Sequence, residues 1–464
     1  MARRADGGVG QGVRPTLPRP CGVDDHRVPL RRRTALSAAA TLPLVVAGLT
    51  SCGAEGEGGG AAPDLSAELP RAEPGPVEDA GELVTPFTAR MLGAIDREEV
   101  NAVCAPLSAQ IALTMIGMGA GGATRTQMEE VLGGRMEDLA ATANTLSQLL
   151  AAVGDEEREQ DDEESPEPAR ASLVNGTWLQ EGFEVQQSFL EDLATWFGSG
   201  VFEADFTDDA EREAAREEIN GWVAESTEDL IEELIPEGTL TASTRLVLVN
   251  ALHLKAAWQE ELTTADGSFT TAEGEELGVE MLQGATGTWY EDEVCRATSL
   301  DTYGGDLALA LVQPAGGLAE VLEGWSEAAT GGGSGLGALL AGLEASEVTT
   351  QLGVPAFDID WGASLKDLLE GLGMTEAFSD AADFSGVTGT KDLVIDEVLQ
   401  KAVLTVDENG MEAAAATAVM VAETSAQVPE HELVLDSPFL VVAYERTTLA
   451  PLVVGWIGDP TQTR

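Results

Sequence analysis

The sequence contains few of the residues that carry enzymatic chemistry. Its 464 residues include only three His, which are His26, His253 and His431. His253 lies within an apolar, strand-like run and His431 in an acidic stretch, so neither is favoured as a catalytic base. The chain also lacks Gly-x-Ser-x-Gly, His-Glu-x-x-His, Cys-x-x-Cys and phosphate-binding Gly motifs. We therefore expect a protein that is not an enzyme and that needs no cofactor and no metal ion.

Cysteine is scarce as well, with four residues in the whole chain. Cys21 and Cys52 fall in an export leader and at its end, which leaves Cys104 and Cys295 for the folded part. Two cysteines cannot form a disulfide framework, and we expect each to be a small buried residue. A single disulfide between them stays open as an alternative, because exported proteins are folded in oxidising surroundings.

Positive charge is the third shortage. Lys and Arg total 25 against 81 Asp and Glu, which gives a formal net charge of −56. Such a chain repels nucleic acid and anionic polysaccharide, so we expect neither a nucleic-acid partner nor a heparin-like polyanion. Nine acidic residues lie within 155–168, together with one Arg and two Pro. We interpret this segment as a solvated acidic insertion.

The amino-terminal segment has the form of an export leader. Three consecutive Arg at 31–33 precede an apolar run at 38–48, and Leu-Thr-Ser-Cys follows at 49–52. This order is typical of a bacterial lipoprotein signal with a lipid-modified Cys52. We predict a leader at 1–51, in which 1–27 reflects an over-extended start, and an exported protein anchored by lipid to the outer face of the cell membrane or extracellular. Both twin-arginine and general export fit the leader.

The rest of the chain divides into a linker and one domain. Residues 52–83 are rich in Gly, Ala, Pro and Glu without apolar periodicity, and they predict a flexible linker. In 84–464 helical patterns come mostly first and antiparallel strand patterns later, which favours a single α+β domain with more than one sheet. The nearly all-apolar run at 246–254 predicts a strand that is buried on both faces.

One stretch, 407–429, combines small side chains with an absence of positive charge. No Lys or Arg occurs between Ala402 and Glu445. Taken as a strand, it has one uncharged face and one face whose only early charge is Glu412. The uncharged face comprises Met411, Ala413, Ala415, Thr417, Val419 and Val421. Both faces suit a strand inserted into a sheet, although the Ala-rich part also fits an ordinary helix, because Ala is the best helix former.

Residues 407–417 resemble the hinge of the reactive loop in serpins, a family of serine protease inhibitors. The similarity extends over roughly 84–460. The residues that carry it are Asn101, Pro106, Ser108, Ile219, Asn220, Trp222, Thr227, Leu248, Asn250, Lys255, Trp258, Gly371, Phe378, Asp383, Lys401, Phe439, Gly455 and Pro460. The resemblance implies one domain with three β-sheets, about eight or nine helices and an exposed reactive loop at 407–429.

The resemblance also implies the function. A serine protease would attack the loop, form an acyl-enzyme and be trapped when the freed hinge inserts into the main sheet. The implied hinge residues are Glu408, Gly410, Met411, Glu412, Ala413, Ala414, Ala415, Ala416 and Thr417, and the implied sheet-opening region is Ser108, Asn250, Trp258 and Gln400. The chain departs from the family pattern at Ala105, Gln400 and Met411, where Ser, His and Thr or Ser are usual.

Two further expectations concern the reactive bond and the target proteases. Counting from Gly410 puts the reactive bond between Thr424 and Ser425, and the bond between Ala422 and Glu423 stays open. A loop without Lys or Arg predicts elastase-like or subtilisin-like targets rather than trypsin-like ones. We expect a monomeric inhibitor. The alternative is a non-inhibitory member of the family, whose loop is cut as a substrate.

Overall fold

The computed structural model describes residues 62–77, 80–155, 157, 165–331, 335–411 and 429–464. The chain divides into two units, Met1–Gly56 and Glu57–Arg464, and every described residue belongs to the second. The leader, Cys52 and the first part of the predicted linker therefore lie outside the described residues. Within the described part of the chain, no helix is long and apolar enough to cross a membrane.

Ten α-helices lie within these ranges, slightly more than the eight or nine expected, because the short α10 and α11 show no clear apolar period. Their bounds are α1 Val84–Ala94, α2 Pro106–Gly117, α3 Gly122–Leu132, α4 Met136–Ala151, α6 Gln187–Phe197, α7 Asp209–Ser226, α8 Leu318–Gly331, α9 Leu336–Glu344, α10 Lys366–Leu372 and α11 Ser385–Thr388. Local chemistry sets several ends. Asp208 caps α7 by accepting hydrogen bonds from the backbone amides of Ala210 and Glu211, and α3 ends at the left-handed Gly133.

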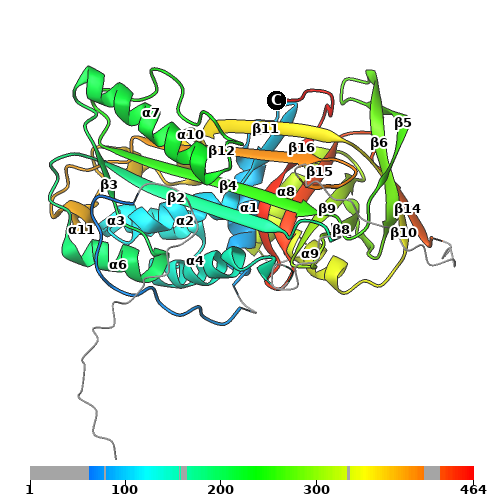
Figure 1. Ribbon diagram of the computed structural model, residues 1–464, viewed down its shortest axis with the longest axis horizontal. Coiled ribbons are helices and arrows are strands. Elements are labelled where there is room, and N and C mark those ends of the chain that lie inside the picture. The colour runs from blue at the N-terminus through cyan, green and yellow to red at the C-terminus, as the bar shows by residue number, and fades with distance from the viewer. Residues whose placement is uncertain (1–61, 78–79, 156, 158–164, 332–334, 412–428) are drawn as a thin grey trace, which may run out of the picture. The chain divides into compact units, whose positions relative to one another are not determined.

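The main sheet has six strands in the order β11-β12-β13-β4-β2-β3. Their bounds are β11 Phe357–Ser364, β12 Glu397–Val406, β13 Gly410–Met411, β4 Leu246–Ala257, β2 Arg170–Gln180 and β3 Phe202–Ala204. The apolar run at 246–254 falls in β4, which is central and buried at all but one position, as predicted. Figure 1 shows α7 across one face of this sheet, with α2, α4 and α6 on the other side.

Two further sheets complete the α+β fold. One has the order β1-β16-β15-β9-β8-β7 and the other β14-β10-β6-β5. Their bounds are β1 Asn101–Cys104, β5 Thr263–Thr270, β6 Glu276–Thr286, β7 Tyr290–Glu291, β8 Cys295–Asp301, β9 Leu307–Pro314, β10 Thr350–Pro355, β14 His431–Val434, β15 Phe439–Glu445 and β16 Ala450–Ile457.

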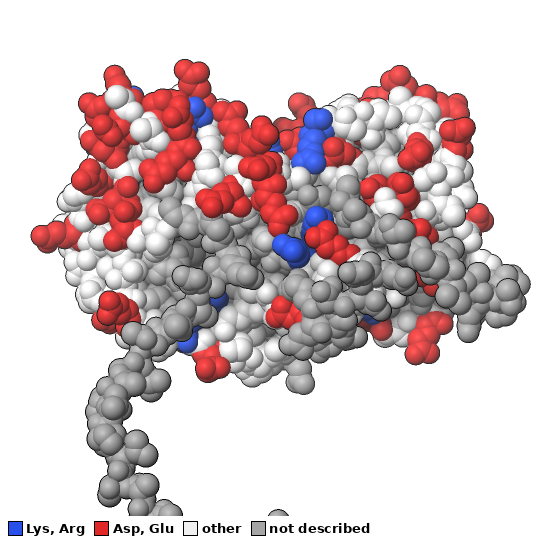
Figure 2. All heavy atoms as spheres, in the orientation of Figure 1, with Lys and Arg blue, Asp and Glu red and all other residues white. Residues whose placement is uncertain are grey.

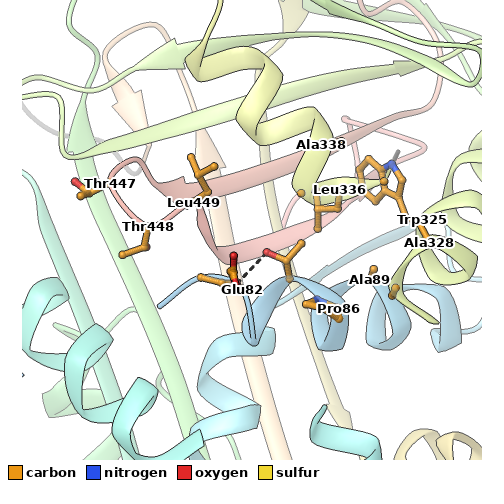
Figure 3. Close-up of a pocket in the computed structure, with 15 residues that line it drawn as sticks. Glu82, Pro86, Ala89, Trp325, Ala328, Leu336, Ala338, Thr447, Thr448 and Leu449 are labelled. Atoms are coloured by element: carbon orange, nitrogen blue, oxygen red, sulfur yellow. Dashed lines mark hydrogen bonds between the residues drawn. The ribbon is translucent and has the colours of Figure 1, made fainter. Parts of the chain in front are cut away.

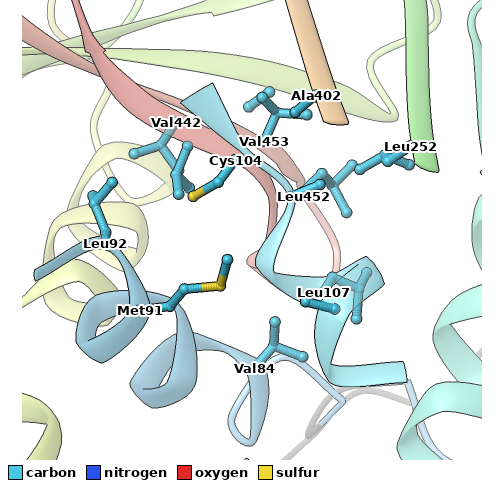
Figure 4. Close-up of a cluster of buried hydrophobic side chains, with 14 of the residues drawn as sticks. Val84, Met91, Leu92, Cys104, Leu107, Leu252, Ala402, Val442, Leu452 and Val453 are labelled. Atoms are coloured by element: carbon cyan, nitrogen blue, oxygen red, sulfur yellow. The ribbon is translucent and has the colours of Figure 1, made fainter. Parts of the chain in front are cut away.

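The two faces of the main sheet bury two separate hydrophobic clusters. The larger one joins its inner face to α1, α2 and the β1–β16 sheet, and Figure 4 shows Met91, Cys104, Leu107 and Leu252 converging there. The smaller one lies under α7 and includes Trp178. Cys104 and Cys295, the two described cysteines, are both buried and free, so the alternative of a disulfide between them is wrong.

Residues 62–77 lie against the domain, whereas the sequence predicted a flexible linker through residue 83. Leu65 forms a backbone bridge with Val201, and the Arg71 Nε donates to Asn144 Oδ1 of α4 at 2.8 Å. The backbone amide of Ala72 donates to the carbonyl of Thr195 in α6 at 2.7 Å. We call residues 62–77 the docked segment. Its contacts are mainly polar and backbone-mediated. The sequence therefore showed no apolar periodicity from which these contacts could be predicted.

Candidate functional site

The hinge enters the main sheet at its first residues. Met411 pairs with Val406 of β12 on one side and Ala256 of β4 on the other, and Gly410 pairs with Ala257. The Met411 side chain is fully buried. Gly410 must lack a side chain, because a Cβ there would lie 2.3 Å from the Ala256 carbonyl oxygen. The expectation of a loop exposed from residue 407 is therefore wrong for its beginning.

The rest of the predicted loop is not described. Glu412, Ala413, Ala414, Ala415, Ala416 and Thr417 of the hinge, and Thr424 and Ser425 of the reactive bond, all lie outside the described residues. Beyond the loop, β14 begins at His431, whose ring stacks on Trp289 with centroids 4.2 Å apart. β14 runs parallel to β10, so both described ends of the loop are held in sheets.

A hydrogen-bonded turn holds the hinge in place. The Asp407 Oδ1 accepts from the backbone amides of Asn409 at 2.7 Å and Gly410 at 2.9 Å. The Trp258 indole donates to the Asp407 carbonyl at 2.9 Å, and the backbone amides of Trp258 and Leu262 donate to the carbonyls of Asn409 and Glu408. Trp258, predicted for the sheet-opening region, therefore contacts this turn, next to the point where β13 enters the main sheet.

The sequence reasoning assigned no role to Asp407 and Leu262. Asp followed three residues later by Gly was the available signal for Asp407, because a short Asp side chain caps the backbone of its own turn. Leu262 contributes only a backbone amide, which no side-chain pattern can reveal.

The other predicted sheet-opening residues do meet at the centre of the main sheet. Gln400 of β12 lies beside Asn250 of β4 and donates to its Oδ1 at 2.8 Å. Its side chain also donates to the Ala105 carbonyl at 2.8 Å and accepts from the Ala105 amide at 3.1 Å. Ser108 donates to Asn175 of β2 at 3.4 Å. Polar side chains therefore join the two central strands to each other and to the start of α2.

β12 and β4 are paired directly, and in parallel, from Glu397 and Val247 to Ala402 and Leu252. At the carboxyl ends of β12 and β4, β13 lies between the two strands. A longer inserted strand would have to separate these pairs, and it would find a hydrogen-bonding edge on each side.

The family model described as "Serpin (serine protease inhibitor)" matches residues 82–460. The chain belongs to the serpin family. It is 30% identical over 380 residues to the leukocyte elastase inhibitor of Bos taurus, covering 78% of this chain and 93% of that relative. It is 29% identical over 371 residues to a serine protease inhibitor of Cyanea capillata, with the same coverage.

Solved structures agree on the fold. The native state of tengpin, a thermophilic serpin, superposes with a TM-score of 0.71, covering 84% of this chain and 97% of that one at 24% identity. The predicted serpin fold with three sheets is thus confirmed. The prediction that the chain is not an enzyme is confirmed as well, because serpins are inhibitors.

The described residues of this serpin hold no group of three or more His, Cys, Asp or Glu arranged to bind a metal ion. Burial raises the pKa of the Cys104 and Cys295 thiols far above the usual range, so neither is a nucleophile. A cavity of about 510 Å³ opens between α1, α8, α9 and the β15–β16 turn (Figure 3), and it is lined by none of the hinge or sheet-opening residues.

Proposed function

We propose that this serpin is a suicide-type inhibitor of serine proteases. The observation that carries the proposal is β13, because Gly410 and Met411 already lie between β12 and β4 and point the chain into the sheet. The protease serine would attack the loop and form an acyl-enzyme, and the freed hinge would continue down the sheet. An inserted strand of about 15 residues at about 3.3 Å each would carry the protease about 50 Å.

The sheet that would receive the strand supports this mechanism. Extending the register of β13 would place Ala413 between Leu404 and Leu254, and Ala415 between Ala402 and Leu252. These receiving side chains are buried in the larger hydrophobic cluster. Small apolar residues suit such positions, because an ion would lose its hydration there.

We assign the reactive bond to Thr424 and Ser425 and the targets to elastase-like or subtilisin-like proteases. The absence of Lys and Arg between Ala402 and Glu445 supports this class, since a trypsin-like pocket requires a basic side chain. The similarity to a leukocyte elastase inhibitor points the same way. A glutamate-specific protease cutting after Glu423 is the second candidate.

We further propose an exported monomer, joined to the outer face of the cell membrane by lipid on Cys52, or extracellular. The leader motif supports this location. Acidic side chains are spread over the face shown in Figure 2, with few Lys and Arg among them. That charge, −56 in all, supports the absence of nucleic-acid and heparin-like partners.

The test is a covalent trap assay on a soluble form that starts at residue 62 and so keeps the docked segment. Mixing it with elastase, subtilisin and trypsin should give a complex with elastase or subtilisin that survives denaturing electrophoresis. Mass spectrometry should find a released carboxy-terminal fragment that begins at Ser425. Cleavage without a complex would place the protein among non-inhibitory members, and stoichiometric trapping of trypsin would contradict the assigned target class.

A further inference from the structure

β14 is the first strand after the reactive loop. It begins at His431, directly after the exposed Glu430, and Figure 1 shows it beside β10 at one end of the domain. Leu433 is buried on its inner side, and the stack of His431 on Trp289 fixes its beginning. The chain that leaves the loop therefore continues into a firmly held edge strand.

The other side of β14 belongs to an outer face of its sheet. Strand register places six residues on this face in two rows, because paired residues of neighbouring strands point to the same side. The first row is Glu432 of β14, Gln351 of β10 and Ala285 of β6, and the second is Val434, Gly353 and Gln283 of the same strands. We call these six residues the β14 face. It is flat, since no side chain rises from Gly353.

Val434 gives the β14 face an apolar centre. It is 39% exposed and is one of three large apolar side chains that are exposed in the described part of the chain. A single exposed valine is common on protein surfaces. The other two, Leu69 and Val100, lie in the docked segment and just before β1. Val434 is thus the exposed apolar side chain that lies on the strand following the reactive loop.

The sheet that carries this face has charges of one sign. Its four strands contain Asp266, Glu276, Glu280 and Glu432 but no Lys or Arg. Glu430 adds a carboxylate directly before β14. Glu430 and Glu432 are both exposed, and neither forms an ion pair with a described residue. A partner surface that carries Lys or Arg would be complementary to them.

The position of this face in the chain fits the size of a protease contact. The assigned reactive bond ends at Ser425, and Glu430 lies five positions later. A chain of that length spans at most about 18 Å, at up to about 3.6 Å per residue. A standard interface buries about 800 Å² on each partner, which corresponds to a disc of about 16 Å radius. A protease centred on the reactive bond would therefore extend to the start of β14.

We propose that the β14 face, together with Glu430, is a second contact surface for the target protease. It would favour proteases that carry Lys or Arg beside the primed side of their cleft, the part that binds residues beyond the cut bond. The proposal rests on the proposed function, from which it takes its partner. A protease cation would pair with Glu430 or Glu432, and its alkyl stem would lie on Val434.

This surface would add a selectivity that the loop residues do not supply. The loop sequence determines which side chain enters the specificity pocket, whereas charges at the rim of an interface govern how fast partners associate. A second copy of this chain is a poor alternative occupant. Two β14 faces would bring the carboxylates of Glu432 together, and like charges repel.

The experiment reverses the two charges and compares them with a matched pair. The test variant of the soluble form combines Glu430→Lys with Glu432→Lys. The control combines Glu273→Lys with Glu275→Lys, which are exposed glutamates with the same spacing in the turn before β6. This turn lies at the opposite end of β6 from Thr286, so the length of the strand separates it from the start of β14 by about 30 Å. Both variants change the net charge equally.

The probe is elastase, or subtilisin if that is the protease trapped, in two forms with either Lys or Glu at two surface positions beside the primed side. The second-order rate of covalent complex formation is measured for each pair. The wild type should react with the Lys form about two- to thirtyfold faster than with the Glu form, the range of two exposed ion pairs. The test variant should reverse this preference, and the control should keep it.

Val434→Ala tests the apolar centre separately. It should slow association with both protease forms about three- to tenfold, and the effect should persist at 1 M salt, where ion pairs are screened. The number of inhibitor molecules consumed per trapped protease should stay unchanged in every variant, because docking precedes cleavage of the loop. Misfolding would change that number as well, and melting curves show whether each variant is folded.

Equal preferences of the wild type and the test variant, in a serpin that traps the protease, would overturn the contact surface and leave the inhibitor function standing. A wild type that traps neither protease would overturn both. A dimer of the free serpin that Val434→Ala dissociates, seen by analytical ultracentrifugation, would assign the face to a second copy and overturn the proposal.

Discussion

Replacing Gln400 with Leu tests what holds the main sheet closed. Gln400 is 1% exposed and makes hydrogen bonds to Asn250 and to both backbone groups of Ala105, which is itself fully buried. Leu keeps the volume but removes the Gln400 partner of two buried groups, the Ala105 amide and the Asn250 Oδ1, whereas the Ala105 carbonyl still accepts from the Ala109 amide at 3.2 Å. A buried polar group that loses its partner costs about 1–3 kcal/mol, so the native form should lose about 2–6 kcal/mol.

This loss can be read as a melting temperature. For a domain the size of the matched region, 82–460, unfolding entropies per residue convert the loss to a fall of roughly 3–7 °C. Calorimetry at one fixed scan rate is the assay, because native serpins that store energy unfold under kinetic control. Gln187→Leu is the control. Gln187 bonds to Glu191 at the surface, and its loss should change the melting temperature by less than about 1 °C.

A fall below about 1 °C for Gln400→Leu would refute the reasoning, because it would mean that these hydrogen bonds do not stabilise the closed sheet. Gln400→His, which restores the residue usual in the family, should lose stability in acid. A buried imidazole has its pKa lowered by desolvation. The unfolded chain then binds more protons, so stability falls as the pH drops below about 6.5.

Three further predictions concern other parts of the molecule. Cutting the loop should raise the melting temperature, because the inserted strand adds backbone pairing and buries apolar side chains; equal values for cut and intact protein would argue for a non-inhibitory member. Ala415→Arg should convert the inhibitor into a substrate, since a charge would be buried on insertion, and retained trapping would contradict the assigned face. Lys391→Met should raise the pKa of Asp383 from about 2 toward 3.8 in an NMR titration. The Lys391 interaction, present above about pH 4 and lost as the carboxylate protonates on approach to pH 2, should then no longer contribute to stability.

Much of the fold could be read from the sequence, because its strongest signals are local. The nearly all-apolar run at 246–254 predicts a strand covered on both faces, and the structure places it in β4. The hinge pattern around Gly410 led to the family and thereby to the three sheets. The same resemblance predicts Gln400, Asn250 and Ser108 for the sheet-opening region, and in the structure Gln400 makes hydrogen bonds to Asn250 of β4 and to Ala105, the residue before α2.

The features that escaped prediction depend on contacts between distant parts of the chain. Lys255 and Glu167 of the acidic insertion form an ion pair at 3.1 Å although they are 88 positions apart, and only strand register shows that Lys255 borders the hinge. Trp258 was predicted for the sheet-opening region, but nothing in the sequence indicated that its indole donates to the Asp407 carbonyl in the hinge turn. Early insertion of Met411 was missed because a strand of two residues has no periodicity to detect.

The docked segment has a consequence for how far the inhibitor could act. A free chain from residue 53 to residue 83 could extend about 100 Å, at up to about 3.6 Å per residue. With residues 62–77 held on α4 and α6, only 53–61 remain between the proposed lipid on Cys52 and the domain, and they reach about 30 Å. An inhibitor with so short a linker would be confined to a thin layer next to the membrane. It would meet proteases bound at the cell surface far more often than proteases that diffuse past it.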